Sequence, residues 1–341
     1  MKIGLVGYQG SGKSTLFEWI TGETADPSQA FSAQTAMAAV PEPRVEPLCE
    51  IYQPKKITLA SLEIVDTPGL SRDHSGSAQK LALIREAGCL VIVVADFGGN
   101  DAKDDISNFD ADLLIADLDI ISGRIERLRE QVKKPRPDRD ELQKELEVLE
   151  PMHAALEEGK ALRDLELNPD QEKMVRSFQL LTLKPRLILV NSGDEAVEQS
   201  QYEDSIPEGA DLLALNIGLE QELDQMDESE RDEFISEMGI ERSDRDHLIR
   251  KIMHVSEQML FFTAGEKEVR TWMIRKGGTA VEAAGNIHTD LAQGFIRAET
   301  MNIDDLVRLG SEREVKAENL LRREPREYVI QDGDIITIQH N

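Results

Sequence analysis

The segment Gly7–Ser14 constrains the fold of this chain more than any other feature of its sequence. It reads GYQGSGKS and matches the phosphate-binding pattern G-x-x-x-x-G-K-[ST] at every fixed position. A strand-like segment, Lys2–Val6, precedes it, and a helical pattern follows it. In that setting, backbone N–H groups and the positive end of a helix surround a phosphate. The segment therefore predicts an α/β domain of the P-loop NTPase type; a merely glycine-rich turn is the alternative.

This loop supplies most of the predicted nucleotide-binding residues. Lys13 is expected to reach the β- and γ-phosphates and to act in catalysis, and Ser14 is expected to offer its hydroxyl to Mg²⁺. Thr15 would lie at the α-phosphate. The predicted nucleotide-binding residues of the loop are Gly10, Ser11, Gly12, Lys13, Ser14 and Thr15.

A second phosphate motif, D-x-x-G, ends the next predicted strand at Asp66–Gly69. P-loop enzymes place an aspartate here that holds Mg²⁺, and a glycine whose N–H faces the γ-phosphate. Asp66 is therefore a predicted metal ligand and Gly69 a predicted catalytic residue. An ordinary aspartate turn is the alternative, but the apolar strand before the motif and the P-loop upstream favour the metal site.

Leu70 follows directly, at the place where Ras-like GTPases carry the glutamine that orients the attacking water. A leucine side chain cannot orient water, so Leu70 is interpreted as a packing residue of a switch loop. Another group must then position the water, and intrinsic hydrolysis is expected to be slow. The candidates are Arg72, Asp73, His74, a bound ion or a partner.

A loop is predicted between the two phosphate motifs, and it contains Ser32 and Thr35. A switch threonine that closes on Mg²⁺ and the γ-phosphate is expected in this position. Thr35 is the favoured residue and is a predicted metal ligand. Simple loop polarity is the alternative.

The base of the nucleotide is expected at residues 191–194, which read NSGD after an apolar strand. GTPases place their base-reading sequence N-K-x-D at this point. Asn191, Ser192 and Asp194 are therefore predicted to bind nucleotide. Asp194 suits the N1–H and N2–H donors of guanine, but Ser192 replaces the lysine that packs over the base. Adenine and guanine both stay open.

Short apolar runs rich in β-branched residues alternate with helical patterns along the chain, which is typical of a parallel sheet covered by helices. The predicted strands after Lys2–Val6 are Leu59–Asp66, Cys89–Ala95, Arg186–Asn191 and Asp211–Ile217.

Two helical seams interrupt this alternation. Apolar residues at spacings of three and four predict a coiled-coil seam in each helix. A breaker, KPRPD at residues 134–138, lies between them, so an antiparallel hairpin is expected, with Pro151 bending the second helix. Two ordinary amphipathic helices packed on the sheet are the alternative. The seams are Leu114, Leu118, Ile121, Ile125, Leu128 and Val132, then Leu142, Leu146, Leu149, His153 and Leu156.

The last quarter of the chain has a different pattern of predicted helices and strands. A helix is predicted over Ser243–Met259, followed by a small α+β module. Its predicted strands are Thr271–Ile274, Gly294–Glu299 and Ile335–Gln339, and its predicted helix is Ala280–Ile287.

Charge is distributed unevenly between these parts. The formal net charge is -27, which excludes a broad electrostatic grip on nucleic acid and argues against DNA as a partner. Residues 257–341 carry only -4 of it, and the rest of the chain carries -23. The C-terminal part could therefore touch RNA through a local basic face; solvated surface charge is the alternative. The candidate residues are Arg270, Arg275, Lys276 and Arg297.

The cellular setting is predicted from what the sequence lacks. Two cysteines, Cys49 and Cys89, form neither a disulfide framework nor a metal cluster. The longest apolar run is far shorter than the ~20 residues that span a bilayer, and the sequence starts with a strand-like segment instead of a signal peptide. A cytoplasmic protein with no membrane partner is expected.

Several longer stretches give the chain a family resemblance. Together with the phosphate motifs, they resemble the YchF or Obg-like ATPases, P-loop proteins of the GTPase superfamily related to translation factors. The stretches are VPEPR (40–44), QPKK (53–56), LEEGK (156–160), FFTAGEKEVR (261–270), AGNIHTD (284–290), GFIRAE (294–299) and YVIQDGD (328–334).

The resemblance extends over nearly the whole chain and implies its organisation. A GTPase-like P-loop domain is expected over residues 1–107 and 169–256, with a coiled-coil hairpin inserted at 108–168 and a β-grasp TGS domain at 257–341. It also implies Mg²⁺ as cofactor, and the ribosome or ribosomal RNA as a partner through the hairpin and the TGS domain. The hydrophobic Leu70 is typical of the family.

Three departures from the family pattern predict a divergent member. Gly10 stands where family P-loops usually have an asparagine, which related enzymes link to a potassium ion that assists hydrolysis. Asp194 stands where the adenine-favouring base loop has a glutamate. The segment after Leu70 is also shorter and lacks the usual glycine-rich run.

Three functions follow as hypotheses. The first is a Mg²⁺-dependent NTPase that cleaves the β–γ bond of ATP or GTP and switches state on the ribosome. The second is a nucleotide-gated binding module for RNA or the ribosome, in which hydrolysis is vestigial. A small-molecule kinase is a third, but it would need an acceptor pocket and a lid, and the D-x-x-G turn argues against it.

Overall fold

The computed structural model describes residues 1–26, 32–72, 77–193, 198–238 and 244–341. Contacts within it divide the chain into two compact units. The first unit comprises Met1–Ala36 and Glu63–Arg245, and the second comprises Met37–Leu62 and Asp246–Asn341. These units differ from the predicted domains in three respects: residues 37–62 group with the C-terminal unit, that unit starts at Asp246 instead of residue 257, and the hairpin groups with the P-loop domain.

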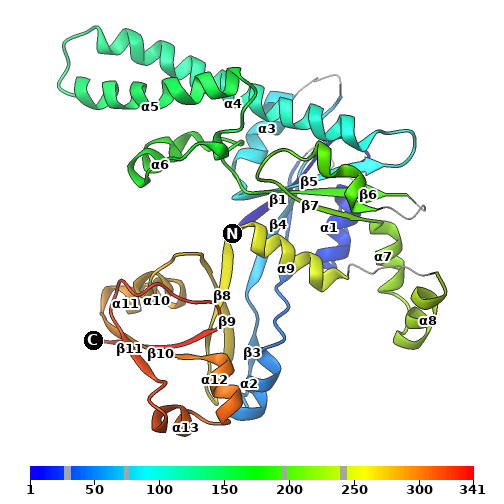
Figure 1. Ribbon diagram of the computed structural model, residues 1–341, viewed down its shortest axis with the longest axis vertical. Coiled ribbons are helices and arrows are strands. Elements are labelled where there is room, and N and C mark those ends of the chain that lie inside the picture. Colours follow the sequence, from blue (N-terminus) through cyan, green and yellow to red (C-terminus); the bar gives the residue numbers. More distant parts are fainter. Residues whose placement is uncertain (27–31, 73–76, 194–197, 239–243) are drawn as a thin grey trace. The chain divides into compact units, whose positions relative to one another are not determined.

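A six-stranded sheet forms the centre of the first unit, in the order β2-β4-β1-β5-β6-β7 (Figure 1). Strand β1 pairs in parallel with β4 and β5, β5 with β6, and β6 with β7. This confirms the predicted α/β class with a parallel sheet. The strands are β1 (Lys2–Val6), β2 (Gln34–Ala39), β4 (Ser61–Asp66), β5 (Cys89–Asp96), β6 (Arg186–Ser192) and β7 (Asp211–Leu215).

The burial of the strand residues fits the order of the strands in the sheet. Every residue of β6 is buried, and so is every residue of β5 before Asp96, as expected for central parallel strands covered on both faces. A core cluster joins β1, β5 and β6 to the first half of α4. The helices of this unit include α1 (Lys13–Thr21), α3 (Ser77–Arg85), α4 (Ala102–Val132), α6 (Pro169–Val175), α7 (Ile217–Leu223) and α8 (Glu228–Met238).

Three sequence predictions about these elements were wrong in detail. The expected loop around Thr35 contains strand β2, whose residues alternate between exposed and buried positions from Thr35 onward. Strand β7 ends at Leu215, because Asn216 caps the N-terminus of α7. The helix expected over Ser243–Met259 is α9 (Arg245–Val255) within the described residues; β8 (Gln258–Thr263) begins after it.

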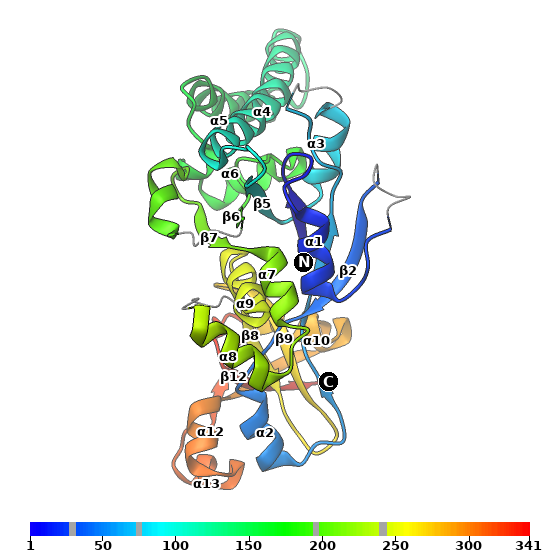
Figure 2. The ribbon, with the colours of Figure 1, turned by 90° about the vertical axis from the view of Figure 1, so that its right-hand side faces the viewer.

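The helical hairpin is confirmed in α4 and α5 (Arg139–Glu157), which lie side by side in Figures 1 and 2. Residues of both predicted seams pack in one apolar cluster, centred on buried Ile121, Leu128 and Leu149. The hairpin does not start where it was predicted, because α4 begins at Ala102. The first half of α4 packs on the sheet. Pro151 lies inside α5, which continues to Glu157.

Buried Asp117 ties α4 to the segment before β6. Its carboxylate accepts hydrogen bonds from the backbone N–H groups of Leu181 (3.0 Å) and Thr182 (2.7 Å) and from the Thr182 hydroxyl (2.9 Å). The guanidinium of Arg85 in α3 donates a fourth bond at 2.7 Å. One fully buried carboxylate thus joins three separate parts of the first unit.

A second six-stranded sheet, of mixed direction, forms the C-terminal unit in the order β11-β10-β12-β8-β9-β3. Its predicted strands and helix are confirmed. Helix α10 (Ala280–Ile287) packs into an apolar cluster with β8, β9, β10 and β12. The strands not yet bounded are β3 (Ile57–Thr58), β9 (Val269–Arg275), β10 (Phe295–Asn302), β11 (Arg322–Glu324) and β12 (Asp334–His340).

Residues 37–62 contribute one strand and one helix to this unit. Strand β3 pairs in parallel with β9, and α2 (Val45–Tyr52) lies beside α12 (Ile303–Leu309), with α13 (Glu312–Ala317) at the same end (Figure 2). Buried Val45 and Leu48 pack in one cluster with Phe262 of β8. Arg44 donates to Asp332 at 2.8 Å, so an ion pair also holds the segment.

Both cysteines are free thiols, as the sequence predicts; Cys89 is buried and Cys49 is partly exposed. In the part of the chain that the structure describes, no helix combines the length and the apolar composition needed to cross a membrane.

Candidate functional site

The loop between β1 and α1 has the backbone of an anion-binding turn. Gly7, Gly10 and Gly12 all have positive φ angles, of 144°, 78° and 99°. A side chain at Gly7 would meet the Val93 carbonyl at 2.2 Å, and one at Gly12 would meet the Asn191 amide at 2.3 Å. Only glycine satisfies both the backbone angle and the space at these positions.

Lys13 opens α1 and is almost completely buried, with 6% of its surface exposed. Its ammonium donates to the carbonyl of Tyr8 at 2.8 Å, so it is folded over the loop. Burial lowers the pKa of Lys13 to about 8; the nearby Asp66 carboxylate opposes that change, and the charge of Lys80 adds to it. A buried cation at a helix N-terminus is suited to hold the phosphates of a nucleotide.

Ser14 and Asp66 meet at the other side of the loop. The Ser14 hydroxyl donates to Asp66 Oδ2 at 2.7 Å, which links the P-loop to the end of β4. Burial raises the pKa of Asp66, although the bond from Ser14 and the charge of Lys13 oppose this. Its other oxygen, Oδ1, is buried and makes no hydrogen bond to the described residues.

These two side chains fit a magnesium ion. A hydroxyl and a carboxylate are the hard oxygen ligands that Mg²⁺ takes, and the unpartnered Oδ1 of Asp66 leaves one oxygen for an ion or its water. Across the described residues, no group of three or more His, Cys, Asp or Glu side chains could hold a metal alone. Phosphate oxygens and water would have to complete the coordination.

The turn at Gly69 is fastened to the P-loop by backbone hydrogen bonds. Leu70 N–H donates to Gly7 O at 3.0 Å, and Gln9 N–H donates to Leu70 O at 3.0 Å. The Leu70 side chain is fully buried in the core, which confirms its interpretation as a packing residue. The second phosphate motif is thereby held directly against the first.

Of the candidates for positioning water, Arg72 is already engaged. Its guanidinium makes two hydrogen bonds to buried Asp105, at 2.6 and 3.0 Å, and lies over the ring of Tyr8 at 5.1 Å. Asp73 and His74 lie outside the described residues. Arg72 is therefore better described as a residue that clamps the P-loop to α4.

The predicted base loop also reaches the P-loop. Asn191 donates from Nδ2 to Ser11 O at 3.1 Å and accepts the N–H of Ile217 at 3.1 Å, so it joins the P-loop, β6 and α7. Ser192 is buried beside it. Asp194 lies outside the described residues.

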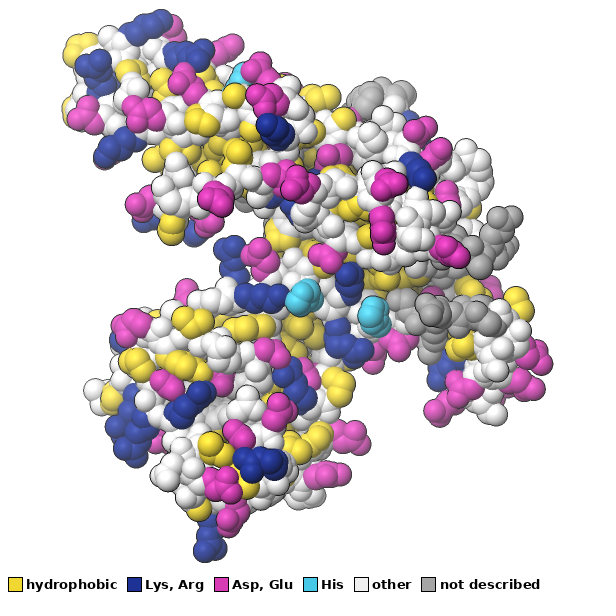
Figure 3. Space-filling view, viewed as in Figure 1, with side chains coloured by type: hydrophobic (Ala, Val, Ile, Leu, Met, Phe, Trp, Pro, Cys, Tyr) yellow, Lys and Arg dark blue, Asp and Glu magenta, His cyan; other side chains and the backbone are white. Residues whose placement is uncertain are grey.

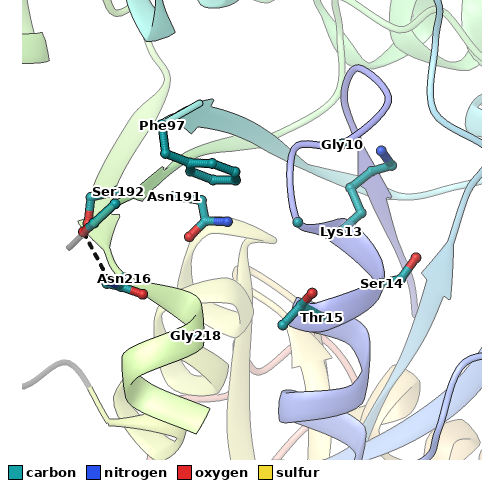
Figure 4. A pocket seen from close by; sticks show the side chains of 11 residues that line it. Gly10, Lys13, Ser14, Thr15, Phe97, Asn191, Ser192, Asn216 and Gly218 are labelled. Atoms are coloured by element: carbon teal, nitrogen blue, oxygen red, sulfur yellow. Dashed lines mark hydrogen bonds between the residues drawn. The ribbon is translucent and has the colours of Figure 1, made fainter. Parts of the chain in front are cut away.

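The P-loop and the base loop line one cavity of about 590 Å³, whose described lining does not include Asp66 or Gly69 (Figure 4). The cavity extends from the P-loop to the ends of β5 and β6. Its lining contains Gly10, Gly12, Lys13, Ser14, Thr15, Phe97, Asn191, Ser192, Gly193, Asn216 and Gly218. The structure thus brings together all predicted nucleotide-binding residues that it describes except Ser11, whose carbonyl holds Asn191.

Three lining residues were missed by sequence reasoning. Phe97 follows directly after β5, and its ring faces into the cavity in Figure 4. Asn216 donates to Gly193 O at 2.9 Å and caps α7, and Gly218 lies in the first turn of that helix. Each follows the carboxyl end of β5 or β7 in the structure, which is where ligands bind in open α/β sheets.

Thr35 is not brought into this cavity. It lies exposed in β2, and the described cavity lining does not include it. Its assignment as a metal ligand stays a prediction.

Two family models match the chain. One is described as "50S ribosome-binding GTPase" and matches residues 2–122. The other, YchF-GTPase_C, is described as "Protein of unknown function (DUF933)" and matches residues 259–341.

Individual relatives match over almost the entire length. The chain is 33% identical to the protein named ribosome-binding ATPase YchF of Escherichia coli O157:H7, covering 100% of this chain and 99% of the relative. Identity to the protein of the same name from Bacillus subtilis is 34%, covering 99% and 98%. Obg-like ATPase 1 of Oryza sativa subsp. japonica is 33% identical, covering 100% and 92%.

A solved structure has the same fold. The YchF GTPase of Schizosaccharomyces pombe superimposes with a TM-score of 0.86 at 27% sequence identity, covering 99% of this chain and 97% of the other. The similarity therefore includes both units and the hairpin.

Proposed function

The chain belongs to the YchF family of P-loop nucleoside triphosphate hydrolases, and on that premise we propose that it is a Mg²⁺-dependent ATPase that acts as a nucleotide switch on the ribosome. One observation supports this more than any other: Ser14 and the buried Lys13 of the P-loop line one cavity, and Ser14 donates a hydrogen bond to the strand-end Asp66. The family relatives named ribosome-binding ATPases supply the substrate and the partner of the proposal.

The proposed reaction is in-line attack of water on the γ-phosphorus. Lys13 would leave the Tyr8 carbonyl and bind the β- and γ-phosphates, and the loop N–H groups would surround the β-phosphate. The N–H of Gly69 would face the γ-phosphate. Because the backbone donors are fixed before the nucleotide arrives, they can stabilise charge in the transition state without reorganising.

Mg²⁺ would be held by Ser14 and, directly or through water, by Asp66. When bound, the ion would neutralise charge on the β- and γ-phosphates. Thr35 is retained as a third proposed ligand. The Ser14–Asp66 hydrogen bond, at 2.7 Å, already holds the first two side chains together for this role.

The base would lie between α7 and the end of β5. Asn191, Ser192 and Asp194 remain the proposed base-loop residues, and Phe97 offers its ring as a stacking surface. Adenine is proposed because the relatives are named ATPases. Guanine is the competing base, since Asp194 suits its two N–H donors.

Phe97→Ala is expected to weaken ATP binding about 5- to 100-fold, because stacking on an aromatic ring contributes roughly 1–3 kcal/mol per base. Phe97→Trp keeps a stacking surface and should retain most of the affinity. Displacement of a fluorescent ATP analogue measures both variants. Equal affinity of Phe97→Ala and the wild type would remove Phe97 from the base site.

The proposed ribosome contacts are the hairpin and the C-terminal unit. In the C-terminal unit the candidate basic residues are not one cluster: Arg275 pairs with Glu257, while Arg297 lies on β10, separated from β9 by two strands. Another group of basic side chains lies on and beside α9. In this group, Lys276 Nζ lies 3.4 Å from His254. Figure 3 shows dark blue Lys and Arg side chains near the cyan histidines in this region. We assign the proposed RNA contact to this α9–β9 face, and we place the protein in the cytoplasm with its ribosomes.

The test combines turnover and binding. The purified chain is expected to release phosphate from ATP with Mg²⁺, faster than from GTP, and to sediment with ribosomes in a manner that differs between the ADP state and a non-hydrolysable ATP analogue. Lys276→Glu should weaken sedimentation while leaving phosphate release unchanged. Absence of ATP hydrolysis, with and without ribosomes, would disprove the enzyme assignment. Nucleotide-dependent sedimentation without hydrolysis would favour the second candidate, a gated binding module, which the two structural units and the hairpin also suit.

A further inference from the structure

A second lysine contacts the D-x-x-G turn, outside the described lining of the cavity. Lys80, in α3, donates from its ammonium to the carbonyl of Gly69 at 2.7 Å, and the contact is partly buried. Sequence reasoning did not single out this residue. Gly69 belongs to the D-x-x-G turn, so Lys80 holds the turn whose N–H is proposed to face the γ-phosphate.

The turn that Lys80 holds lies against the P-loop. A side chain at Gly69 would lie 2.9 Å from the Cα atom of Gln9, so the turn and the loop are in close contact. The charge of Lys80 also helps to lower the pKa of Lys13. Lys80 thus holds a turn that is in direct contact with the loop that carries Lys13.

Three other residues near the Gly69 turn do not supply an available positive charge. The Leu70 side chain is fully buried in the core, and Arg72 is paired with Asp105. Gly10 contributes no side chain, and the space that its Cβ would enter contains no described atom within 4 Å. An ammonium has three N–H donors, and the Gly69 carbonyl takes only one of those on Lys80.

We propose that Lys80 is a catalytic residue, whose two remaining N–H donors bind γ-phosphoryl oxygens and stabilise their charge as the β–γ bond breaks. The inference rests on the proposed hydrolase function. Water forms the new bond to the γ-phosphorus, and the bridging oxygen leaves with the electron pair on ADP. The proton of the water passes to the released phosphate or to solvent, and Lys80 stays protonated throughout.

The alternative is a purely structural tether of the Gly69 turn, and three variants separate the two roles. Lys80→Gln can still donate to the Gly69 carbonyl but has no charge, whereas Lys80→Arg keeps the charge. Lys184→Gln is the matched control, because Lys184 also donates to a backbone carbonyl, that of Ala87, just before β6 and away from the P-loop. Binding of ADP and of ADP with aluminium fluoride, which mimics the transferring phosphoryl group, is measured for each variant.

In single-turnover ATP hydrolysis, Lys80→Gln is expected to be slower than the wild type by a factor on the order of 100, the effect of removing one fixed donor from a transition state. Its ADP affinity should stay within about threefold, and it should lose affinity for ADP with aluminium fluoride. Lys80→Arg should recover at least about a tenth of the rate, and Lys184→Gln should match the wild type.

Three outcomes would overturn the inference. Hydrolysis by Lys80→Gln at the wild-type rate would show that the charge is not used. Loss of ADP binding by both Lys80 variants would identify a structural tether. A wild-type chain that hydrolyses no ATP would remove both this inference and the proposed function, whereas the first two outcomes leave the proposed function intact.

Discussion

Lys13→Ala is expected to lower ATP turnover at least ~100-fold, the largest loss of activity for a single change in this chain. Lys13 lies at the start of α1 with 6% of its surface exposed, so its interactions with phosphate are weakly screened by water. Alanine removes that charge and leaves the negative phosphates facing only backbone N–H groups. Phosphate release under saturating ATP and Mg²⁺ is the measurement.

Two further variants test whether the loss of turnover in Lys13→Ala is specific to the lysine side chain at this position. Lys13→Arg keeps the charge, but its planar guanidinium is larger and cannot fold over the Tyr8 carbonyl in the same way, so it should recover little activity. Lys103→Ala removes an exposed lysine of α4 and should leave turnover unchanged. Turnover by Lys13→Ala within about threefold of the wild type would show that the catalytic site lies elsewhere.

Asp117→Ala is expected to lower the free energy of unfolding of the P-loop unit by about 3–5 kcal/mol, because removing one partner of a buried ion pair leaves the other charge uncompensated. Arg85 would lose its carboxylate, and the N–H groups of Leu181 and Thr182 would lose their acceptor. Chemical denaturation followed by circular dichroism measures the change.

A neighbour on the same helix provides the control for Asp117. Asp119 has the same side chain but is exposed, so Asp119→Ala should change stability by less than about 0.5 kcal/mol. Asp117→Asn keeps the shape and two acceptor lone pairs but loses the charge, and it should fall between the two. Equal stability of Asp117→Ala and Asp119→Ala would contradict the structural role assigned to the buried carboxylate.

The fold could be predicted from sequence where a local pattern is typical of a single type of structure. Strands β5 and β6 are continuous apolar runs, and a run of this kind fits only a sheet covered on both faces. The seams of α4 and α5 repeat at helical spacing and have a proline-rich breaker between them. The P-loop residues are constrained by phosphate chemistry, so their motif identified them directly.

The missed parts depend on contacts that are distant in sequence. Strand β2 reads QTAMAA and is rich in alanine, which is depleted in strands, so pairing at the edge of the sheet stabilises it where local propensity does not. Lys80 and Phe97 belong to no motif, and only the folded chain brings them to the Gly69 turn and the nucleotide cavity. The end of α9 was placed too late because Met259 continues its apolar spacing, although the chain turns at Glu257, which has a φ of 58°.

Residues 37–62 belong to the C-terminal unit although they lie far from it in sequence, which limits where the chain can be divided. The C-terminal family model begins at residue 259, yet the sheet it describes has β3 as an edge strand and α2 in its core. A gene segment that encodes only 259–341 lacks both elements, and a chain shortened to 1–258 exposes Val45 and Leu48. Neither unit is encoded by one uninterrupted stretch of sequence, so a cut between residues 258 and 259 does not separate two complete folds.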